Sequence, residues 1–269
     1  MRVLKYGCIG DDVRYLQYLL KVKGFYKGLI DGDFRKLTDN AVRTFQAEKN
    51  LTVDGKVGPQ TRKALDFQDI HVHVFSRETQ LWFAGMPYDE HKAIMRLPVK
   101  DRPDVCFPLE TWAQKENADM VFNLAMFNFS DGATITYLKG EAKDIGYGGV
   151  ADRVAINWKN VCGGYKTAIR NGKYVGASRV GKRSRNAVGK LTNDLFFIAQ
   201  SLYSVTEYYL TKYMLTNYPV DTMLFEDGGG STAMLDARMN ALIIPERSAL
   251  PPKHKAHGRP VASVLCARF

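Results

Sequence analysis

Apolar residues recur at helical spacing near the start of the chain. The first such face is formed by Val13, Leu16, Leu19 and Leu20. Asp11 and Asp12 precede this face, and we expect one of them to cap the helix because carboxylates are favoured beside its free amide groups. Gly24 is predicted to end the helix, and Thr38 to cap a second one that buries Ala41, Val42 and Phe45. The pattern therefore predicts a small helical region first.

The segment 7–65 contains an imperfect internal repeat. Val-Arg-Tyr-Leu-Gln at 13–17 is followed by Asp31-Gly32, and Val-Arg-Thr-Phe-Gln at 42–46 is followed by Asp54-Gly55. The two Asp-Gly pairs predict turns whose glycines take positive φ. With Gly58-Pro59 starting a last helix, these motifs resemble a small three-helix peptidoglycan-binding domain. The resemblance implies attachment to bacterial cell wall near Asp31 and Asp54, although both residues also suit purely structural turns. Arg35, where that family usually has glycine, predicts a differently built turn.

The rest of the chain alternates short apolar runs with glycine-rich turns. HVHVF, ADMVFNLAMF, RVAINW, DLFFIAQ, DTMLF and VASVLCA are predicted strands, and TEYYLTKYMLTN is a predicted helix. We therefore expect an α+β protein, with an all-α domain at 1–67 and a larger mixed α/β-sheet domain at 68–269, joined without a flexible linker.

Composition narrows the choice of partner. The 269 residues carry a formal charge of +10, with 13 Lys and Arg against 8 Asp and Glu in residues 1–67. An anionic partner is expected, and the spread of charge over both parts argues against a nucleic-acid arm.

We expect no membrane span and no secretory signal at the start of the chain. The cysteines lie far apart, which disfavours a disulfide framework. His71 and His73 share a strand face, with a metal pair as the weaker alternative.

Glycines and acids are concentrated in LFEDGGGSTAML. Here Glu226 and Asp227 arrive at the end of a predicted strand, directly before Gly228, Gly229 and Gly230. Glycines let a ligand approach the backbone closely, and successive amides can cradle an anion. Ser231 and Thr232 add hydroxyl groups, so the segment suits a phosphate or a sugar. A tight structural turn is the alternative.

Four segments in order resemble the phosphodiester glycosidase domain. They are VFNLAMFNFSDGATITYLKGE, RSRNAVGKLTNDLFFIAQ, TEYYLTKYMLTN with DTMLFEDGGGSTAML, and HGRPVASVLCAR. The resemblance covers about residues 119–268 and implies hydrolysis of a sugar joined through its anomeric carbon to a phosphodiester. Glu226 departs from the family, which usually has an apolar residue there, and so does the strongly basic segment Lys-Arg-Ser-Arg-Asn.

The resemblance implies roles for residues at the motif positions. Arg185 and Arg259 would bind the phosphate, since a guanidinium meets two of its oxygens at once, with a structural ion pair as the alternative. Asp227 would bind sugar hydroxyls or act as base or nucleophile, and these roles stay open. Adjacent strand residues face opposite ways, so Glu226 would pair with it only if the strand breaks there. A divalent ion on Asp227 is a minor alternative to a site without cofactor.

Two further residues complete the expected substrate site. Asn123 would hydrogen-bond the sugar or its acetamido group. Phe127 would stack on the ring or, as the preferred interpretation, pack in the core.

Both halves together suggest a hydrolase directed to the bacterial wall. Its expected target is a sugar-1-phosphodiester of the N-acetylglucosamine-1-phosphate type in an anionic glycopolymer such as teichoic acid or its linkage unit. Without a secretory signal, such a protein would reach the wall after phage-type release or after trimming. A wall-binding protein without catalysis is the alternative, and nucleic-acid binding is disfavoured because no recognised motif accompanies the charge.

Overall fold

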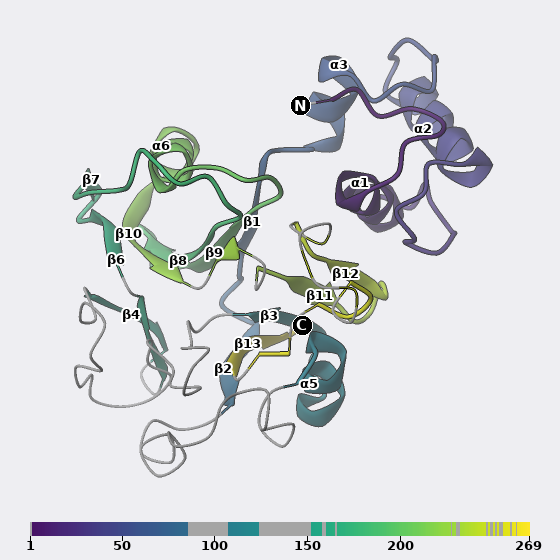
Figure 1. The fold of residues 1–269 in the computed structure, drawn as a ribbon. Coiled ribbons are helices and arrows are strands. Elements are labelled where there is room, and N and C mark those ends of the chain that lie inside the picture. The colour runs from purple at the N-terminus through teal and green to yellow at the C-terminus, as the bar shows by residue number, and fades with distance from the viewer. Residues whose placement is uncertain are drawn as a thin grey trace. The chain divides into compact units, whose positions relative to one another are not determined.

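The protein consists of two compact units, which we describe separately (Figure 1). One comprises Met1–Asp69 and Asp236–Ile243, and the other Ile70–Leu235 and Ile244–Phe269. The computed structural model describes residues 2–85, 107–123, 152–157, 160–164, 166–226, 228–229, 232–245, 247, 250, 252, 255–258, 260–261 and 263–269. In this part of the chain, no helix is long and apolar enough to cross a bilayer.

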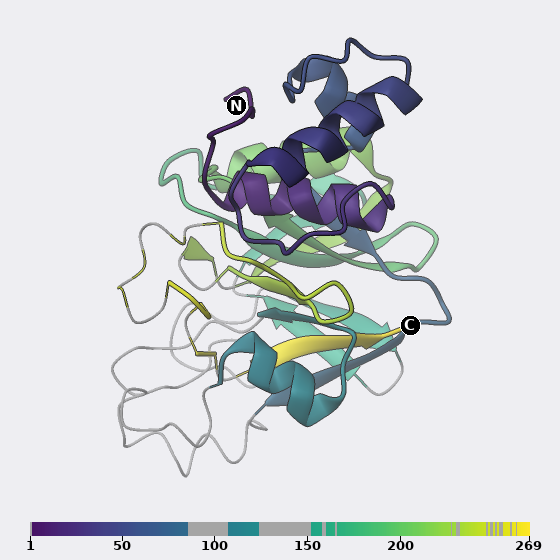
Figure 2. The same ribbon diagram turned by 90° about the vertical axis from the view of Figure 1, so that its right-hand side faces the viewer.

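The first unit is built on three helices, as the sequence predicts. They are α1 (Asp11–Val22), α2 (Lys36–Glu48) and α3 (Pro59–Leu65). Figure 2 shows α1 and α2 lying against each other. Fully buried side chains between the helices include Leu16, Leu20, Phe34, Phe45 and Leu65. Of the predicted apolar face of α1, Val13, Leu16 and Leu20 are buried in the core, whereas Leu19 is half-buried.

Both predicted helix caps are wrong. Gly10 precedes α1 with φ of 148° and gives no side-chain cap, while Asp12 instead forms an ion pair of 2.8 Å with Arg2. Helix α2 starts three residues earlier than predicted, after Arg35 instead of Thr38, so Thr38 lies in its first turn. There Thr38 is buried and accepts a hydrogen bond from Gln17. The polar side chains at these helix starts are used in tertiary contacts rather than in capping.

The predicted turns are confirmed. Gly24 follows α1 with φ of 83°, and its amide donates to the Lys21 carbonyl at 3.0 Å. Gly32 and Gly55 have φ of 77° and 71°. Left-handed backbone of this kind favours glycine because it has no Cβ. Arg35 has φ of −106° and does not need to be glycine.

The described strands form three antiparallel sheets, whose residues belong to the second unit except for Asp236 and Ala241–Ile243. The six-stranded sheet has the order β1-β9-β8-β10-β6-β7, the five-stranded sheet β12-β11-β3-β13-β2, and a hairpin joins β4 and β5. The six-stranded sheet uses β1 (Ile70–Val74), β6 (Lys166–Arg170), β7 (Lys173–Tyr174), β8 (Asn186–Leu191), β9 (Phe196–Ser201) and β10 (Val220–Glu226). The other strands are β2 (Gln80–Gly85), β3 (Met120–Asn123), β4 (Asp152–Asn157), β5 (Asn160–Gly164), β11 (Met234–Asp236), β12 (Ala241–Ile243) and β13 (Ser263–Arg268).

Helix α6 (Glu207–Asn217) covers the six-stranded sheet (Figure 1). Thr206 caps it by accepting the Tyr209 amide at 3.1 Å. Leu210 and Met214 of the helix belong to one buried cluster with Phe225 of the sheet. The sequence predicts this helix and the strands that contain HVHVF, DLFFIAQ and DTMLF, whereas α5 (Leu109–Glu116) is an additional helix.

Candidate functional site

In the N-terminal unit, each Asp-Gly turn is held by the glutamine that ends one copy of the repeat. Gln17 donates from Nε2 to Asp31 Oδ1 at 2.8 Å, and its Oε1 accepts the Gly32 amide at 2.8 Å. The same Nε2 atom lies 3.1 Å from Thr38 Oγ1 and 3.1 Å from the carbonyl of Asp33. We call this group the first clasp.

The second clasp repeats these bonds, while Gln17 alone has a further bond, of 3.3 Å, to Tyr26 Oη. Gln46 donates from Nε2 to Asp54 Oδ1 at 3.0 Å, and its Oε1 accepts the Gly55 amide at 2.9 Å. Thr61 Oγ1 and the carbonyl of Lys56 lie 3.2 and 2.9 Å from the same nitrogen. The repeat seen in the sequence is thus a repeat of hydrogen bonds, and the two glutamines are its central members.

The clasps lower the pKa of both aspartates. For Asp54, the largest cause is the hydrogen bond from the Lys56 amide, followed by that from Gln46. For Asp31, desolvation acts in the opposite direction, but hydrogen bonds from Gln17 and from the Asp33 amide outweigh it. One oxygen of each carboxylate is therefore committed to the turn.

A hollow of about 330 Å³ lies beside the second clasp. Its polar wall comes from Thr52, Asp54, Lys56 and Gln60, and Pro59 and Val3 contribute apolar surface. A shallow space with both kinds of surface suits a sugar or a short peptide. Asp54 is therefore placed where it can meet a ligand as well as hold its turn.

In the larger unit, the glycine segment lies tightly against the residues before β8. A Cβ on Gly228 would come within 2.7 Å of the Ser184 carbonyl oxygen. Gly229 has φ of 65°, and its amide donates to the same oxygen at 2.7 Å. Ser184 Oγ in turn donates to the Gly229 carbonyl at 2.6 Å. The Gly229 amide is therefore used within the protein, and this glycine pair is explained by close packing rather than by an anion cradle.

Several predicted site residues lie outside the described part of the chain. They are Phe127, Asp227, Gly230, Ser231 and Arg259. Their roles remain predictions.

A buried polar cluster forms where β3, β8, β9 and β10 meet the segment after the glycines. Asn186 stands opposite Glu226 on β10 and opposite Gln200 on β9. Its Nδ2 atom donates to the Asn123 carbonyl at 2.6 Å, and Asn123 Oδ1 accepts the Ala233 amide at 2.8 Å. Elements distant in sequence thus bring polar side chains to one place.

Three atoms of this cluster are buried without a hydrogen-bond partner among the described residues. They are Asn123 Nδ2, Asn186 Oδ1 and Thr232 Oγ1. Leaving such a group unsatisfied costs on the order of 1–3 kcal/mol, so proteins seldom bury several together without a ligand or water. Glu226 is 1% exposed in the same cluster. The predicted residues Asn123, Glu226 and Thr232 therefore lie together in one buried polar region.

Arg185 forms a structural ion pair, the alternative that its sequence position left open. Its Nη1 atom lies 3.4 Å from Glu207 Oε1, and its Nη2 atom donates to the Gly181 carbonyl at 2.5 Å. Glu207 also accepts from Lys166 at 2.8 Å and from the Ser178 amide at 2.8 Å. The guanidinium, 8% exposed overall, is thus held by the protein itself, which disfavours a phosphate role.

The histidine pair on β1 is part of the packing. The ring of His73 lies 4.6 Å from that of Phe75 and 6.0 Å from that of Phe122, centroid to centroid. Burial, with a smaller contribution from His73, lowers the pKa of His71 to about 3. Over the described ranges, no three His, Cys, Asp or Glu side chains are grouped to hold a metal ion.

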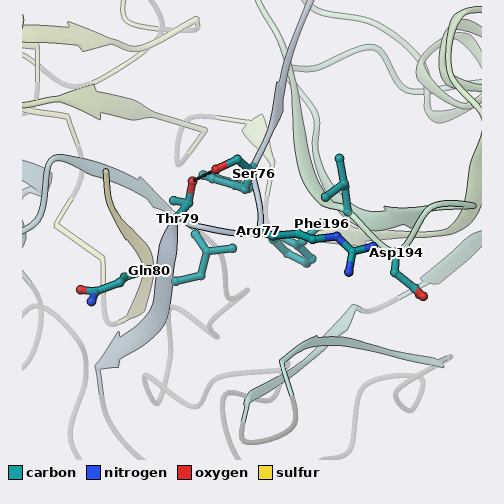
Figure 3. A pocket seen from close by; sticks show the side chains of 9 residues that line it. Ser76, Arg77, Thr79, Gln80, Asp194 and Phe196 are labelled. Carbon is teal, nitrogen blue, oxygen red and sulfur yellow. Dashed lines mark hydrogen bonds between the residues drawn. The ribbon is translucent and has the colours of Figure 1, made fainter.

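A separate pocket of about 510 Å³ lies at the other end of the six-stranded sheet (Figure 3). Its wall includes Arg77, Gln80 and Asp194, with Phe75 and Phe196 at its apolar side. Figure 3 shows Arg77 extending toward Asp194, while Ser76 and Thr79 share a hydrogen bond of 3.1 Å. On β9, Phe196 and Gln200 are four residues apart, about 13 Å at strand spacing, so this pocket is distinct from the polar cluster.

Asn186, Gln200 and Glu207 are site or supporting residues that sequence reasoning missed. Gln200 ends the predicted strand DLFFIAQ, where a buried polar residue after apolar ones was the available signal. Asn186 lies outside every predicted strand, in a segment singled out only by the family resemblance. Glu207 had no such signal, because an acid in the first turn of a helix is ordinary.

Comparison with known proteins covers the small unit most strongly. Residues 9–65 match the peptidoglycan binding domain family. The N-terminal residues form a peptidoglycan-binding domain. N-acetylmuramoyl-L-alanine amidase CwlM of Mycobacterium tuberculosis is 48% identical over 58 residues, which are 22% of this chain and 14% of that protein. A spore cortex-lytic enzyme of Halalkalibacterium halodurans is 45% identical over 65 residues, 24% of this chain and 20% of that protein.

The larger unit has a remote structural likeness. The catalytic domain of zebrafish N-acetylglucosamine-1-phosphodiester alpha-N-acetylglucosaminidase, auto-inhibited by its pro-peptide, superposes with a TM-score of 0.49 and 14% identity. The superposition covers 75% of this chain and 84% of that one.

Proposed function

We propose that this protein attaches to bacterial peptidoglycan through its N-terminal domain and hydrolyses a wall glycopolymer with its larger unit. The family match at residues 9–65 supports attachment. Relatives that share this domain are named as wall-lytic enzymes, which supports pairing it with a hydrolase. The hollow beside Asp54 is our candidate for the wall-binding groove, with Asp54 itself making the contact.

The observation that carries the catalytic half is the group of three buried polar atoms without described partners, on Asn123, Asn186 and Thr232. A sugar offers hydroxyl and acetamido groups that both donate and accept, and so it matches an amide nitrogen, an amide oxygen and a hydroxyl together. We assign these atoms to the sugar of a sugar-1-phosphodiester.

In the proposed reaction, water adds to the anomeric carbon while the bond from that carbon to the phosphate oxygen breaks. The products are the free sugar and a phosphate monoester, and one proton is released. Phosphate is a good leaving group, so stabilising its charge matters more than protonating it. We propose Asp227 as base or nucleophile and Arg259 as the phosphate ligand. Glu226 is held as the second carboxylate in the buried cluster.

A glycan-binding protein without catalysis is the second candidate. Two observations favour it: the Gly229 amide and the Arg185 guanidinium both bond to other groups of the protein. Neither is then available to donate to a reacting phosphate.

The deciding experiment uses an α-N-acetylglucosamine-1-phosphodiester in oxygen-18 water, with Asp227→Ala in parallel and Asn186→Ala as a probe of the polar cluster. Label in the released sugar and loss of turnover in Asp227→Ala are expected. Label in the phosphate would make the protein a phosphodiesterase. Wall binding without turnover of this compound or of purified wall polymer would establish the binding protein.

A further inference from the structure

The positive charge of the larger unit is concentrated in one segment. Residues 153–193 contain ten Lys and Arg and no Asp or Glu. The net charge of this segment, +10, equals that of the whole chain. The remaining residues of the larger unit therefore carry more acids than bases. Such a segment attracts anions through its summed field as well as through individual contacts.

Five cations from this segment and from α6 form what we call the basic face. They are Lys173, Arg179, Lys182, Arg183 and Lys212, all exposed. None of them forms an ion pair with a carboxylate in the described ranges. Their neighbours Lys166, Arg185 and Lys190 are by contrast paired with Glu207 or Asp194. The basic face thus consists of cations for which the described residues supply no carboxylate partner. Lys173 lies on β7, the edge strand of the six-stranded sheet, and Lys212 lies on α6; both elements are labelled in Figure 1, and their rings Tyr174 and Tyr208 are 5.9 Å apart.

The backbone that carries the basic face is fixed to α6. The Ser178 amide donates to Glu207 Oε2 at 2.8 Å, and the Ser178 carbonyl accepts the Tyr208 amide at 3.0 Å. Arg183 exchanges backbone hydrogen bonds of 3.2 and 2.9 Å with Val205. Little ordering of the backbone is then needed when an anion binds, which favours affinity.

Of the tyrosines beside the cations, Tyr208 is half-buried, whereas Tyr174 and Tyr209 are 40% and 44% exposed. The guanidinium of Arg179 lies 4.4 Å from the centre of the Tyr208 ring, and the Tyr174 ring meets it edge-on at 5.9 Å. Binding of single-stranded nucleic acid relies on aromatic faces on which bases stack. Exposed aromatic surface therefore lies beside the cations, and the choice of a wall polyphosphate over a nucleic acid rests on the peptidoglycan-binding match of residues 9–65.

The basic face adjoins the candidate site along the chain. Arg183 is followed by Ser184, whose carbonyl accepts the Gly229 amide and lies against Gly228, and by Asn186 of the buried polar cluster. A chain lying over Lys182 and Arg183 would be close to that cluster.

We propose that the basic face binds the repeating phosphates of a linear wall polymer and so presents its terminal or linking sugar to the buried polar cluster. Presentation of the sugar to the buried polar cluster rests on the proposed function, whereas binding of the polymer to the basic face does not depend on it. The ligand class is a poly(alditol phosphate) with one negative charge per repeat.

The test compares the full-length protein with a variant carrying Lys173→Gln, Arg179→Gln, Lys182→Gln and Arg183→Gln. A matched control carries Lys5→Gln, Lys23→Gln, Lys27→Gln and Lys36→Gln, which removes the same charge from exposed positions of the other unit. The probe is poly(glycerol phosphate), titrated at several salt concentrations, with single-stranded DNA of equal charge alongside. Turnover of the small phosphodiester is measured for each protein.

We expect the basic-face variant to bind the polymer at least tenfold more weakly at low salt. Its slope of log affinity against log salt should fall by about 2 to 3, on the order of 0.7 for each lost phosphate contact. The control should bind as the parent does, and small-substrate turnover should be unchanged in both.

Equal losses in variant and control, or no polymer binding by the parent, would overturn the proposal. If single-stranded DNA bound as tightly as the polymer, the basic face would be a site for polyanions in general, and the assignment to a wall polymer would be wrong. If no protein turns over the small substrate but the difference in polymer binding holds, the proposed hydrolase fails and the basic face stands.

Discussion

The carboxamide of Gln46 holds the turn that contains Asp54, donating to its Oδ1 atom at 3.0 Å. Gln46 is 1% exposed, so its removal leaves the Gly55 amide buried without its acceptor. Gln46→Ala should lower the free energy of unfolding of the N-terminal domain by about 2 kcal/mol. Gln17→Ala should cost at least as much, because the first clasp has the corresponding bonds and one more to Tyr26.

Chemical denaturation followed by circular dichroism would measure this loss, with Asn40→Ala on the exposed side of α2 as the control. A Gln46→Ala protein as stable as the control would show that the clasp contributes nothing net. Wall binding should weaken together with stability in this variant, whereas Gln60→Ala, which changes only the wall of the hollow, should weaken binding alone.

Alanine at Gly228 should disturb the glycine segment more than alanine at a free position. The new Cβ would stand 2.7 Å from the Ser184 oxygen, and overpacking of this kind costs about 1–3 kcal/mol. Gly176→Ala is the matched control, since nothing lies within 4 Å of its added Cβ. The midpoint temperature of thermal unfolding and the turnover of the small phosphodiester should both fall for Gly228→Ala and stay unchanged for Gly176→Ala. A fully active Gly228→Ala protein would contradict the close packing described here.

Loss of the Glu207 charge should destabilise the larger unit. Glu207→Gln leaves the buried guanidinium of Arg185 and the ammonium of Lys166 without their shared carboxylate. Removing one partner of a buried pair costs about 3 kcal/mol. Asp194→Asn breaks an exposed pair with Lys190 and should cost less than about 1 kcal/mol. Equal effects of the two substitutions in urea denaturation would argue that Arg185 is not held structurally and would return it to the candidate phosphate ligands.

The stability of the larger unit should fall in mildly acidic solution because of His71. Its folded pKa is lowered to about 3 by burial, so the unfolded chain binds this proton first as pH falls below about 6.5. Above that pH, His71 does not change the free energy of unfolding. Below it, the free energy of unfolding falls with decreasing pH, with a slope that approaches about 1.4 kcal/mol per pH unit. Unfolding between pH 6.5 and 5 should depend less on pH in His71→Gln than in the parent. The exposed His257→Gln serves as control, and identical profiles for all three proteins would refute the effect.

The sequence was sufficient for the N-terminal domain because its signals are local. Apolar spacing, the Asp-Gly turns and the helix-ending Gly24 each act within a few residues, and all were confirmed. The caps were wrong because Asp12 and Thr38 make tertiary contacts with Arg2 and Gln17, which local preference does not reveal.

The candidate site was predicted only in part for the opposite reason. Asn123, Glu226 and Thr232 could be named from motifs, but Asn186 and Gln200 join them through strand register, which no single segment encodes. Arg185 stood at a plausible phosphate position until its partner Glu207, far away in sequence, was placed beside it.

The two clasps also bear on how the N-terminal domain reaches its structure. Gln17 and Asp31 are 14 residues apart, and Gln46 and Asp54 only 8. Contacts at such short separation lose little chain entropy on closing and accompany fast folding. The polar framework around each turn can thus assemble from one short stretch of chain. A wall-binding unit of this design should refold quickly after unfolding, before the long-range strand pairing of the larger unit is complete.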